Sequence, residues 1–203
     1  MRQYVDYLGF LAGTGAGRRT LDYPDPHRDV DAGAGRRKML IWIGAGDWMN
    51  PGASGPNNAL PGAMTAMPAC SYYAGIVSKT AMLLGKPAEA ASYAAVAKDV
   101  ADRYNAAYFH ADTGIYGDRA DQQTAMVLPL ALGISPEDRR ELVLARLIDA
   151  IHARNEHVGV GFVGLPFLLG TLTLVRRADL ANRMVNQRDY PDWAGGLSVC
   201  IHA

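Results

Sequence analysis

Apolar side chains recur at intervals of three and four residues from Tyr72 onward, which is the spacing that gives a helix one buried face. This spacing predicts one helix over 72–84 and a second over 87–108, with Gly85 between them. Glycine often ends a helix because it adopts the left-handed conformation without strain. We therefore expect an antiparallel hairpin of two helices joined by a very short turn. The side chains expected on the buried face of the first helix are Tyr73, Ile76, Val77, Thr80, Leu83 and Leu84.

The same pattern predicts two more helical hairpins downstream. In the first, a helix over 121–132 ends at Gly133, and Ser135 is the expected N-cap of the helix that follows. The second joins helices over 162–175 and 178–188. The buried stripe expected on the helix after Ser135 consists of Leu144, Leu147, Ile148 and Ile151.

A further helix is expected over residues 1–12, which brings the total to roughly seven helices with almost no strand signal. Residues 13–68 are rich in Gly, Pro, Asp and Asn, and long loop regions of this kind often carry function. A chain of 203 residues with 49% hydrophobic content has the usual size of one domain. We expect a single all-α domain with helical hairpins over 69–193 and a divergent tail over 194–203.

Composition excludes several classes of function. Lys plus Arg and Asp plus Glu both number 20, so no broad basic face is predicted and nucleic acid is not an expected partner. No apolar run reaches membrane-spanning length, and the N-terminus lacks the basic and apolar regions of an export signal. We expect a soluble, cytoplasmic chain without a membrane partner.

The cysteines and histidines predict neither a disulfide framework nor a metal site. Cys70 and Cys200 lie far apart without a second pair, so we expect free thiols. The histidines show no paired spacing with a third ligand, so no metal and no cofactor is expected. No Gly-x-Ser-x-Gly elbow occurs, which argues against acyl transfer. The five histidines are His27, His110, His152, His157 and His202.

The most informative cluster is the glycine-rich segment around Asp47 and Trp48. An indole offers a flat apolar face to the C–H side of a pyranose, and a carboxylate accepts hydrogen bonds from hydroxyl groups. This pair of side chains is therefore typical of a site that orients a sugar ring. The alternative is purely structural: an aromatic plug over a turn that Asp47 caps.

Two other polar segments are candidate sites. Asp118 and Asp121 stand where side chains normally cap a helix, but capping does not account for the residues 122–124 that follow. The glycine-spaced loop over 158–164, just after His157, lacks the Lys and Ser or Thr of a phosphate-binding loop. We expect no phosphate site there. Asp112-Thr113-Gly114 is predicted to be a turn between two helices without chemistry.

Taken in order, these segments resemble the six-hairpin catalytic domain of bacterial α-L-rhamnosidases, glycoside hydrolase family seventy-eight. The similarity covers nearly the whole chain from Met1 to about Trp193. The matching motifs are Gly46-Asp47-Trp48, Ser71-Tyr72-Tyr73, Gln123-Thr124-Ala125, Gly161-Phe162-Val163-Gly164-Leu165-Pro166 and Tyr190-Pro191-Asp192-Trp193. The stretch 13–38 fits no pattern of the family, and Gly159, Val160 and Leu165 stand where the family usually has threonines.

The resemblance implies an incomplete (α/α)6 barrel that binds a terminal α-L-rhamnoside and needs no cofactor. Inverting members of the family use a general acid and a general base roughly 6.5 to 9.5 Å apart. The family's Arg-Asp-Glu-Arg segment with the acid and its Thr-Ile-Trp-Glu segment with the base both have no match here. We therefore expect no catalytic residue in this chain and no activity of the chain alone. The residues that the resemblance assigns to the sugar are Asp47, Trp48, Gln123, Phe162 and Trp193, although core packing also accounts for the last three.

Three hypotheses follow. The first is a fragment of a rhamnosidase-like glycosidase, which would expose apolar residues such as Leu144, Leu147 and Ile151 and self-associate or bind a complementing fragment. The second is a non-catalytic carbohydrate-binding or helical scaffold protein, which would bind sugar without turnover. The third is a helical solenoid of the tetratricopeptide kind, which ranks last because its repeat of about 34 residues is not evident.

Overall fold

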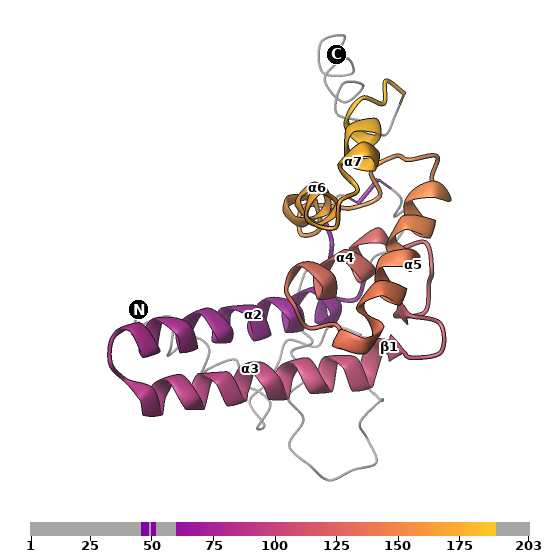
Figure 1. The fold of residues 1–203 in the computed structure, drawn as a ribbon. Helices are drawn as coiled ribbons and strands as arrows, with labels where there is room; N and C mark the ends of the chain where they lie inside the picture. The colour runs from indigo at the N-terminus through magenta and orange to yellow at the C-terminus, as the bar shows by residue number, and fades with distance from the viewer. Residues whose placement is uncertain (1–45, 49, 52–59, 190–203) are drawn as a thin grey trace. The chain divides into compact units, whose positions relative to one another are not determined.

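The computed structural model describes residues 46–48, 50–51 and 60–189 (Figure 1). This described part is mostly helical, which confirms the expected all-α class. The elements in chain order are α2 (Gly62–Leu83), α3 (Pro87–Tyr108), β1 (Phe109–His110), β2 (Ile115–Tyr116), α4 (Gln123–Ala131), the 3-10 turn η1 (Glu137–Arg139), α5 (Arg140–His152), α6 (Leu165–Leu174) and α7 (Ala178–Val185).

The chain divides into two compact units. The first consists of Met1–Ala45 and Pro61–Tyr108, and the second of Gly46–Leu60 and Phe109–Ala203. The single domain that we expected stays a prediction, and the units are described one at a time. The helix expected over 1–12 lies outside the described residues.

In the first unit, α2 and α3 form the expected antiparallel hairpin (Figure 1). The Ser71 hydroxyl donates to the Ala97 carbonyl at 2.8 Å, and the Ser78 hydroxyl donates to the Ala90 carbonyl at 2.7 Å. The later donor on α2 binds the earlier acceptor on α3, so the two helices run in opposite directions. Gly85, with a φ of +68°, ends α2 in the left-handed conformation as predicted.

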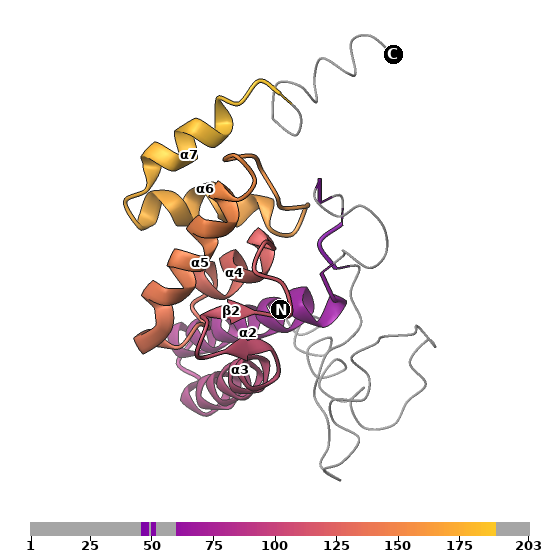
Figure 2. The same cartoon turned by 90° about the vertical axis from the view of Figure 1, so that its right-hand side faces the viewer.

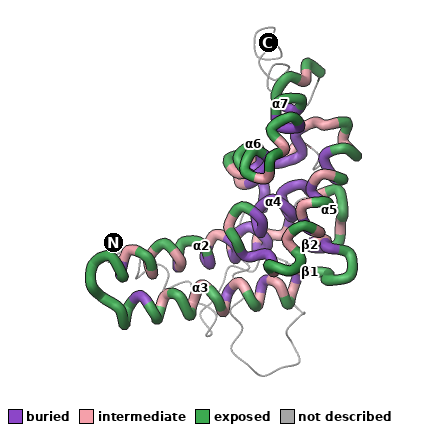
Figure 3. Tube along the Cα trace, viewed as in Figure 1, coloured by how far each residue is buried: buried purple, intermediate pink, exposed green. Residues whose placement is uncertain are grey.

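The buried face predicted for α2 is wrong. Tyr73, Ile76 and Leu83 are exposed, whereas Ala74 and Ala81 are buried. Together with Ser71 and Ser78, whose hydroxyls reach α3, these alanines form a stripe at helical spacing. Small side chains let two helix backbones approach closely, so they face α3 and the larger side chains do not. Figure 3 shows the exposed positions around the turn between α2 and α3 in green.

The start of α2 was also predicted wrongly, because the helix begins at Gly62 and not at Tyr72. Residues 62–68, which we expected in the loop region, therefore belong to α2. Pro68 lies inside the helix, where it lacks the N–H group for the usual bond to the preceding turn. Proline and glycine usually mark helix ends, and here the alanines and methionines between them continue the helix.

In the second unit, α4 is the central helix. It packs against α5 and α6, and α6 packs against α7 (Figure 2). Every residue from Gln123 to Leu130 is buried, because the apolar sequence of α4 has no polar side to face water. Gly133, with a φ of +70°, follows the end of α4 as predicted.

The predicted helix caps are wrong. No side chain caps the N-terminus of α4 or of α5. Gln122 holds the N-cap position of α4 without a capping bond from its side chain, and the Asp121 carboxylate accepts a hydrogen bond from Arg119 Nε at 2.9 Å instead. Ser135 is buried, and the 3-10 turn η1 separates it from α5. The expected cap at Ser135 fails because Pro136 directs the chain into that turn before the α-helix begins.

The buried stripe of α5 is partly as expected. Leu147 and Ile151 are fully buried, whereas Val143 and Ala150 take the places assigned to Leu144 and Ile148. Leu147 and Ile151 were expected to be exposed in an incomplete barrel, and this was wrong because α5 packs on α4 within the second unit. The exposed apolar side chains are others, with Leu83 and Leu174 the most exposed among the described residues.

The remaining features of the second unit follow the sequence pattern closely. The turn at Asp112-Thr113-Gly114 is confirmed, although it joins the two short antiparallel strands β1 and β2 and not two helices. The hairpin of α6 and α7 is present with shorter helices than predicted.

Cys70, in the first unit, is a buried free thiol whose pKa is raised by burial, and Cys200 lies outside the described residues. Among the described residues, no helix is long and apolar enough to cross a membrane.

The core position of Leu147 gives a first prediction. Leu147→Ala should lower the free energy of unfolding by about 2–5 kcal/mol, because the vacated space under α4 cannot collapse completely. Leu174→Ala is the matched control, since Leu174 is 86% exposed, and it should change stability by no more than about 0.5 kcal/mol. Urea unfolding followed by circular dichroism measures both, and equal effects would contradict the assigned core.

Candidate functional site

The segment around Asp47 turns sharply and brings this residue to the loop before α6. Gly46 has a φ of +66°, and a Cβ atom there would collide with the carbonyl oxygen of Leu60. Only glycine satisfies both conditions. The glycine of the Gly-Asp-Trp motif is therefore needed for the backbone path that places Asp47.

Asp47 is 3% exposed, and both oxygens of its carboxylate accept hydrogen bonds from this chain. Oδ2 accepts from the Thr124 hydroxyl and from the Gly161 N–H at 2.6 Å. Oδ1 accepts from the Val163 N–H at 3.0 Å and the Gly164 N–H at 3.1 Å. Helix N-termini carry unpaired N–H groups and a partial positive charge, and α6 begins directly after this loop. The carboxylate of Asp47 thus fills the anion-binding position at the start of α6.

A second side chain fixes the earlier part of the same loop. Gln123 is fully buried at the start of α4; its amide oxygen accepts from the Gly159 N–H at 2.8 Å, and its amide nitrogen donates to the His157 carbonyl at 3.0 Å. Asn50 donates to the Gly159 carbonyl at 3.0 Å. Residues 157–164 are therefore held along their length by side chains that are distant in sequence.

The three glycines of this loop are required by close packing. A Cβ on Gly161 would lie 2.7 Å from the carbonyl oxygen of Asp47, and one on Gly164 would lie 2.8 Å from the Thr124 hydroxyl. A Cβ on Gly159 would lie 2.9 Å from the amide carbon of Gln123. The glycine spacing that resembled a phosphate cradle is explained by these contacts, and Asp47 already occupies the amides.

Trp48 and Phe162 form an exposed aromatic pair on this framework. Their ring centroids lie 5.6 Å apart with an interplanar angle of 33°. The Phe162 N–H donates to the Trp48 carbonyl at 2.9 Å, so the two backbones are joined as well. Trp48 is 66% exposed and Phe162 is 58% exposed, which is unusual for such large apolar rings. Two rings held side by side in water offer a ready surface to the C–H face of a sugar.

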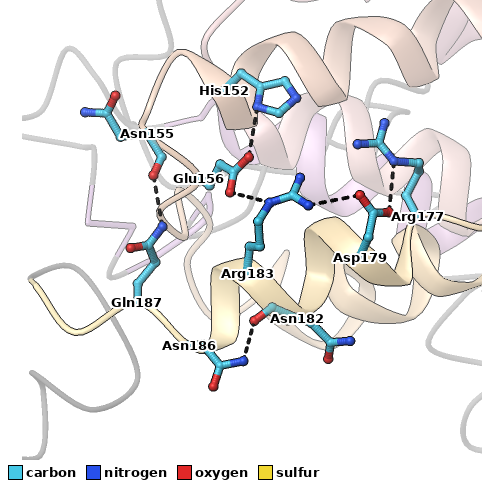
Figure 4. Close-up of polar contacts among 9 residues, drawn as sticks. All are labelled: His152, Asn155, Glu156, Arg177, Asp179, Asn182, Arg183, Asn186 and Gln187. Atoms are coloured by element: carbon cyan, nitrogen blue, oxygen red, sulfur yellow. Dashed lines mark hydrogen bonds and ion pairs between the residues drawn. The ribbon is translucent and has the colours of Figure 1, made fainter.

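An ion-pair network fixes the far end of the loop to α7 (Figure 4). Arg183 donates to Glu156 at 2.8 Å and to Asp179 at 3.1 Å, and the Gln187 amide donates to the Asn155 carbonyl at 3.1 Å. The hydrogen bond from Arg183 is the main reason that the pKa of Glu156 lies below its ordinary value. The network stabilises the chain reversal after α5.

The structure brings four of the five predicted site residues together within the second unit. Asp47, Trp48, Gln123 and Phe162 all belong to or contact the loop before α6, and Trp193 lies outside the described residues. Trp48 and Phe162 are exposed, whereas the polar groups of Asp47 and Gln123 are occupied by the chain itself. Direct contact of any of them with a sugar stays a prediction.

Sequence reasoning missed the partners of these residues. Thr124 binds Asp47 across 77 positions of sequence, and its only signal was that capping did not explain why polar residues open α4. In the network of Glu156, Asp179 and Arg183, the spacing of four residues between Asp179 and Arg183 was the available signal, and Glu156 had none. The described residues hold no cluster of His, Cys, Asp and Glu that could bind a metal ion.

Comparison with known families agrees with the resemblance seen in the sequence. Residues 18–198 match the family described as bacterial alpha-L-rhamnosidase 6 hairpin glycosidase domain. An α-L-rhamnosidase of Streptomyces avermitilis is 32% identical over 150 residues, which is 74% of this chain and 14% of that protein. An α-L-rhamnosidase of Formosa agariphila is 30% identical over 149 residues, which is 72% of this chain and 16% of that protein.

Solved structures show the same similarity. The Streptomyces avermitilis α-L-rhamnosidase complexed with L-rhamnose has a TM-score of 0.68 at 29% identity, covering 78% of this chain and 14% of that one. An α-L-rhamnosidase of Dictyoglumus thermophilum has a TM-score of 0.66 at 28% identity, covering 76% of this chain and 17% of that one. The chain thus spans only a small part of the length of the relatives that it matches.

The packing around Gly161 predicts a strong effect of one methyl group. Gly161→Ala should lower the free energy of unfolding by about 1–3 kcal/mol, because its Cβ forces the loop away from the backbone of Asp47 and Trp48. Gly170→Ala in α6 is the matched control, since no atom lies within 4 Å of the new Cβ, and it should stabilise the protein by about 0.5–1 kcal/mol. Thermal unfolding of both variants checks the opposite signs.

The Glu156–Arg183 pair predicts a dependence of stability on pH. Because the folded state lowers the pKa of Glu156, the pair contributes stability above the unfolded pKa of about 4.3 and loses it as the pH falls through the folded pKa. The wild type should be modestly more stable than Glu156→Gln at pH 7, since the Arg183 side chain is 47% exposed and water screens the pair, and this difference should shrink as the pH falls below about 4.3. Urea unfolding over a series of pH values measures it; a difference that does not change with pH would rule out the charge pair as its source.

Proposed function

Because the chain belongs to the family of bacterial α-L-rhamnosidase six-hairpin glycosidase domains, we propose that it forms part of the sugar-binding surface of an α-L-rhamnosidase. The observation that carries this proposal is the exposed pair of Trp48 and Phe162 on a rigidly bonded loop. Exposing two large rings costs free energy in water, so their retention side by side suits a surface that a ligand covers. A terminal rhamnose has an apolar C–H face that two such rings match.

In the proposed reaction, this chain binds and orients the sugar and other residues of the enzyme perform the hydrolysis. Inversion needs one carboxylic acid on the leaving oxygen and one carboxylate that activates water on the opposite face of the ring. The resemblance places both in segments that this chain does not match. Trp48 and Phe162 hold the ring by contact with its C–H groups, and Trp193 is proposed as a third aromatic contact.

A second candidate function is sugar binding without catalysis. The observation that favours it is the engagement of Asp47, the carboxylate of the Gly-Asp-Trp motif. Both of its oxygens bind donors of this chain, so it has no free position with which to activate a water molecule. In this reading the chain recognises a rhamnose-containing glycoside without turnover.

The proposed partner is a complementing part of the same kind of barrel. On the first unit, α2 and the residue that follows it expose large apolar side chains that would find neighbours in a complete barrel: Tyr72, Tyr73, Ile76, Met82, Leu83 and Leu84. Exposed apolar area of this kind promotes association. We propose that these side chains pack against a complementing fragment or, in its absence, against a second copy of the chain.

Binding of free L-rhamnose tests the sugar surface. Saturation-transfer NMR should show contact between the sugar and the wild-type chain, and Trp48→Ala or Phe162→Ala should weaken the affinity by about tenfold, since each removes one ring of the pair. Leu174→Ala and Tyr73→Ala, at exposed apolar positions that do not belong to the pair, should bind like the wild type. Equal binding by all five proteins would exclude Trp48 and Phe162 as the sugar contacts.

Hydrolysis of a chromogenic α-L-rhamnoside separates the two candidate functions in part. The chain alone should release no chromophore, because the acid and the base lie in segments that it does not match. Addition of the complementing part of a relative should restore turnover if the chain is a component of a hydrolase. Turnover by the chain alone that Asp47→Ala abolishes would instead make Asp47 a catalytic residue and overturn the assignment above.

A further inference from the structure

We infer that Asp47 is a positioning residue: its buried carboxylate builds the aromatic pair by ordering the loop before α6, and it does not itself bind the sugar. The inference concerns how the pair of Trp48 and Phe162 is formed. It rests on the proposed function only for the identity of what the pair binds. It replaces the direct sugar contact that the sequence suggested for Asp47.

The first argument is occupancy. A carboxylate offers about four lone-pair positions, and the four donors that approach Asp47 are one hydroxyl and three backbone N–H groups. The Asn50 amide adds a longer contact at 3.4 Å. With 3% of Asp47 exposed, a sugar hydroxyl would have to displace one of these bonds to a charged acceptor, which are stronger than bonds between neutral groups.

The second argument is the position of Phe162 between the bonded groups. The N–H groups of Gly161, Val163 and Gly164 bind the Asp47 carboxylate, and the N–H group of Phe162 binds the carbonyl of Trp48. The four consecutive N–H groups from Gly161 to Gly164 therefore all bind either Asp47 or its neighbour Trp48. This arrangement fixes the backbone on both sides of Phe162 and sets its ring beside Trp48.

The third argument is charge and shape. All four close partners are donors, so the site requires an acceptor at both oxygen positions. An asparagine has the same shape, but its NH₂ group is a donor and would face either the Thr124 and Gly161 donors or the Val163 and Gly164 donors. Asp47→Asn therefore disturbs the loop with almost no change in volume.

Amide hydrogen exchange of the whole chain, measured by NMR without ligand, tests the inference. We expect Asp47→Asn to raise the exchange rates of Gly161, Val163 and Gly164 by about tenfold or more, relative to amides of α4 in the same protein. The ratio to α4 separates loop opening from a general loss of stability. Leu147→Ala is the matched control: it destabilises the core of the same unit, including α4, and should not raise the ratio.

Titration with L-rhamnose then separates positioning from direct contact. Asp47→Asn should weaken binding by the factor by which it lowers the population of the ordered loop, because only the ordered loop sets Phe162 beside Trp48. Weaker binding with an unchanged ratio would mean that Asp47 contacts the sugar directly and would overturn the inference. An unchanged ratio with unchanged binding would overturn it as well.

Two further outcomes remain decisive. If Asp47→Asn does not fold, Thr124→Val keeps the carboxylate but removes one donor, and it should raise the same ratio by a smaller factor; no rise would count against the inference. If the wild type binds no rhamnose, the proposed function fails, while a raised exchange ratio in Asp47→Asn still supports Asp47 as the residue that builds the pair.

Discussion

A buried carboxylate that receives four hydrogen bonds holds the candidate site together. Burial of an unpaired charge would cost several kcal/mol, and proteins accept a buried carboxylate only where donors replace water. Here the donors are the Thr124 hydroxyl and the N–H groups that precede α6, which have no helical partner of their own. The carboxylate thus satisfies N–H groups that lack a helical acceptor, and these donors replace the water that the buried carboxylate has lost. The loop, the start of α6 and the aromatic pair all depend on this exchange.

The positions of the helices were largely predictable because periodicity and glycine placement report local physics. Gly85 and Gly133 mark helix ends by their left-handed backbone, a property that needs no knowledge of the rest of the chain. The buried face of α2 was not predictable in the same way. Which face is buried depends on what packs against it, and a neighbouring helix selected the small stripe of Ala74 and Ala81 over the larger Tyr73. The caps at Asp121 and Ser135 failed for a related reason, since an arginine and a proline nearby offered stronger local alternatives.

For the candidate site, the sequence indicated which residues take part but not what each of them does. The residue types at Asp47, Trp48, Gln123 and Phe162 were found from the sequence, and the structure gathers all four around one loop. Their roles could not be read from the sequence, because an aspartate that binds a sugar and one that binds a loop have the same side chain. Burial and the list of donors decide between these roles. The ion pairs around Arg183 escaped prediction because charged residues are common on helix surfaces, and because one partner, Glu156, lies 27 positions away in sequence.

The location of these bonds has a consequence for a chain that spans only a small part of its relatives. Asp47, Thr124 and the loop over 157–164 all belong to the second unit, so the hydrogen bonds that set the aromatic pair are made within that unit. Thr124 is in turn fixed by α4, whose residues from Gln123 to Leu130 are all buried. The aromatic pair is therefore positioned by bonds that lie within the second unit. Hydrolysis does need other parts, because two carboxylates must stand on opposite sides of the sugar. The proposed sugar contact and the hydrolysis thus depend on different groups, and the hydrogen bonds around Asp47 account only for the first.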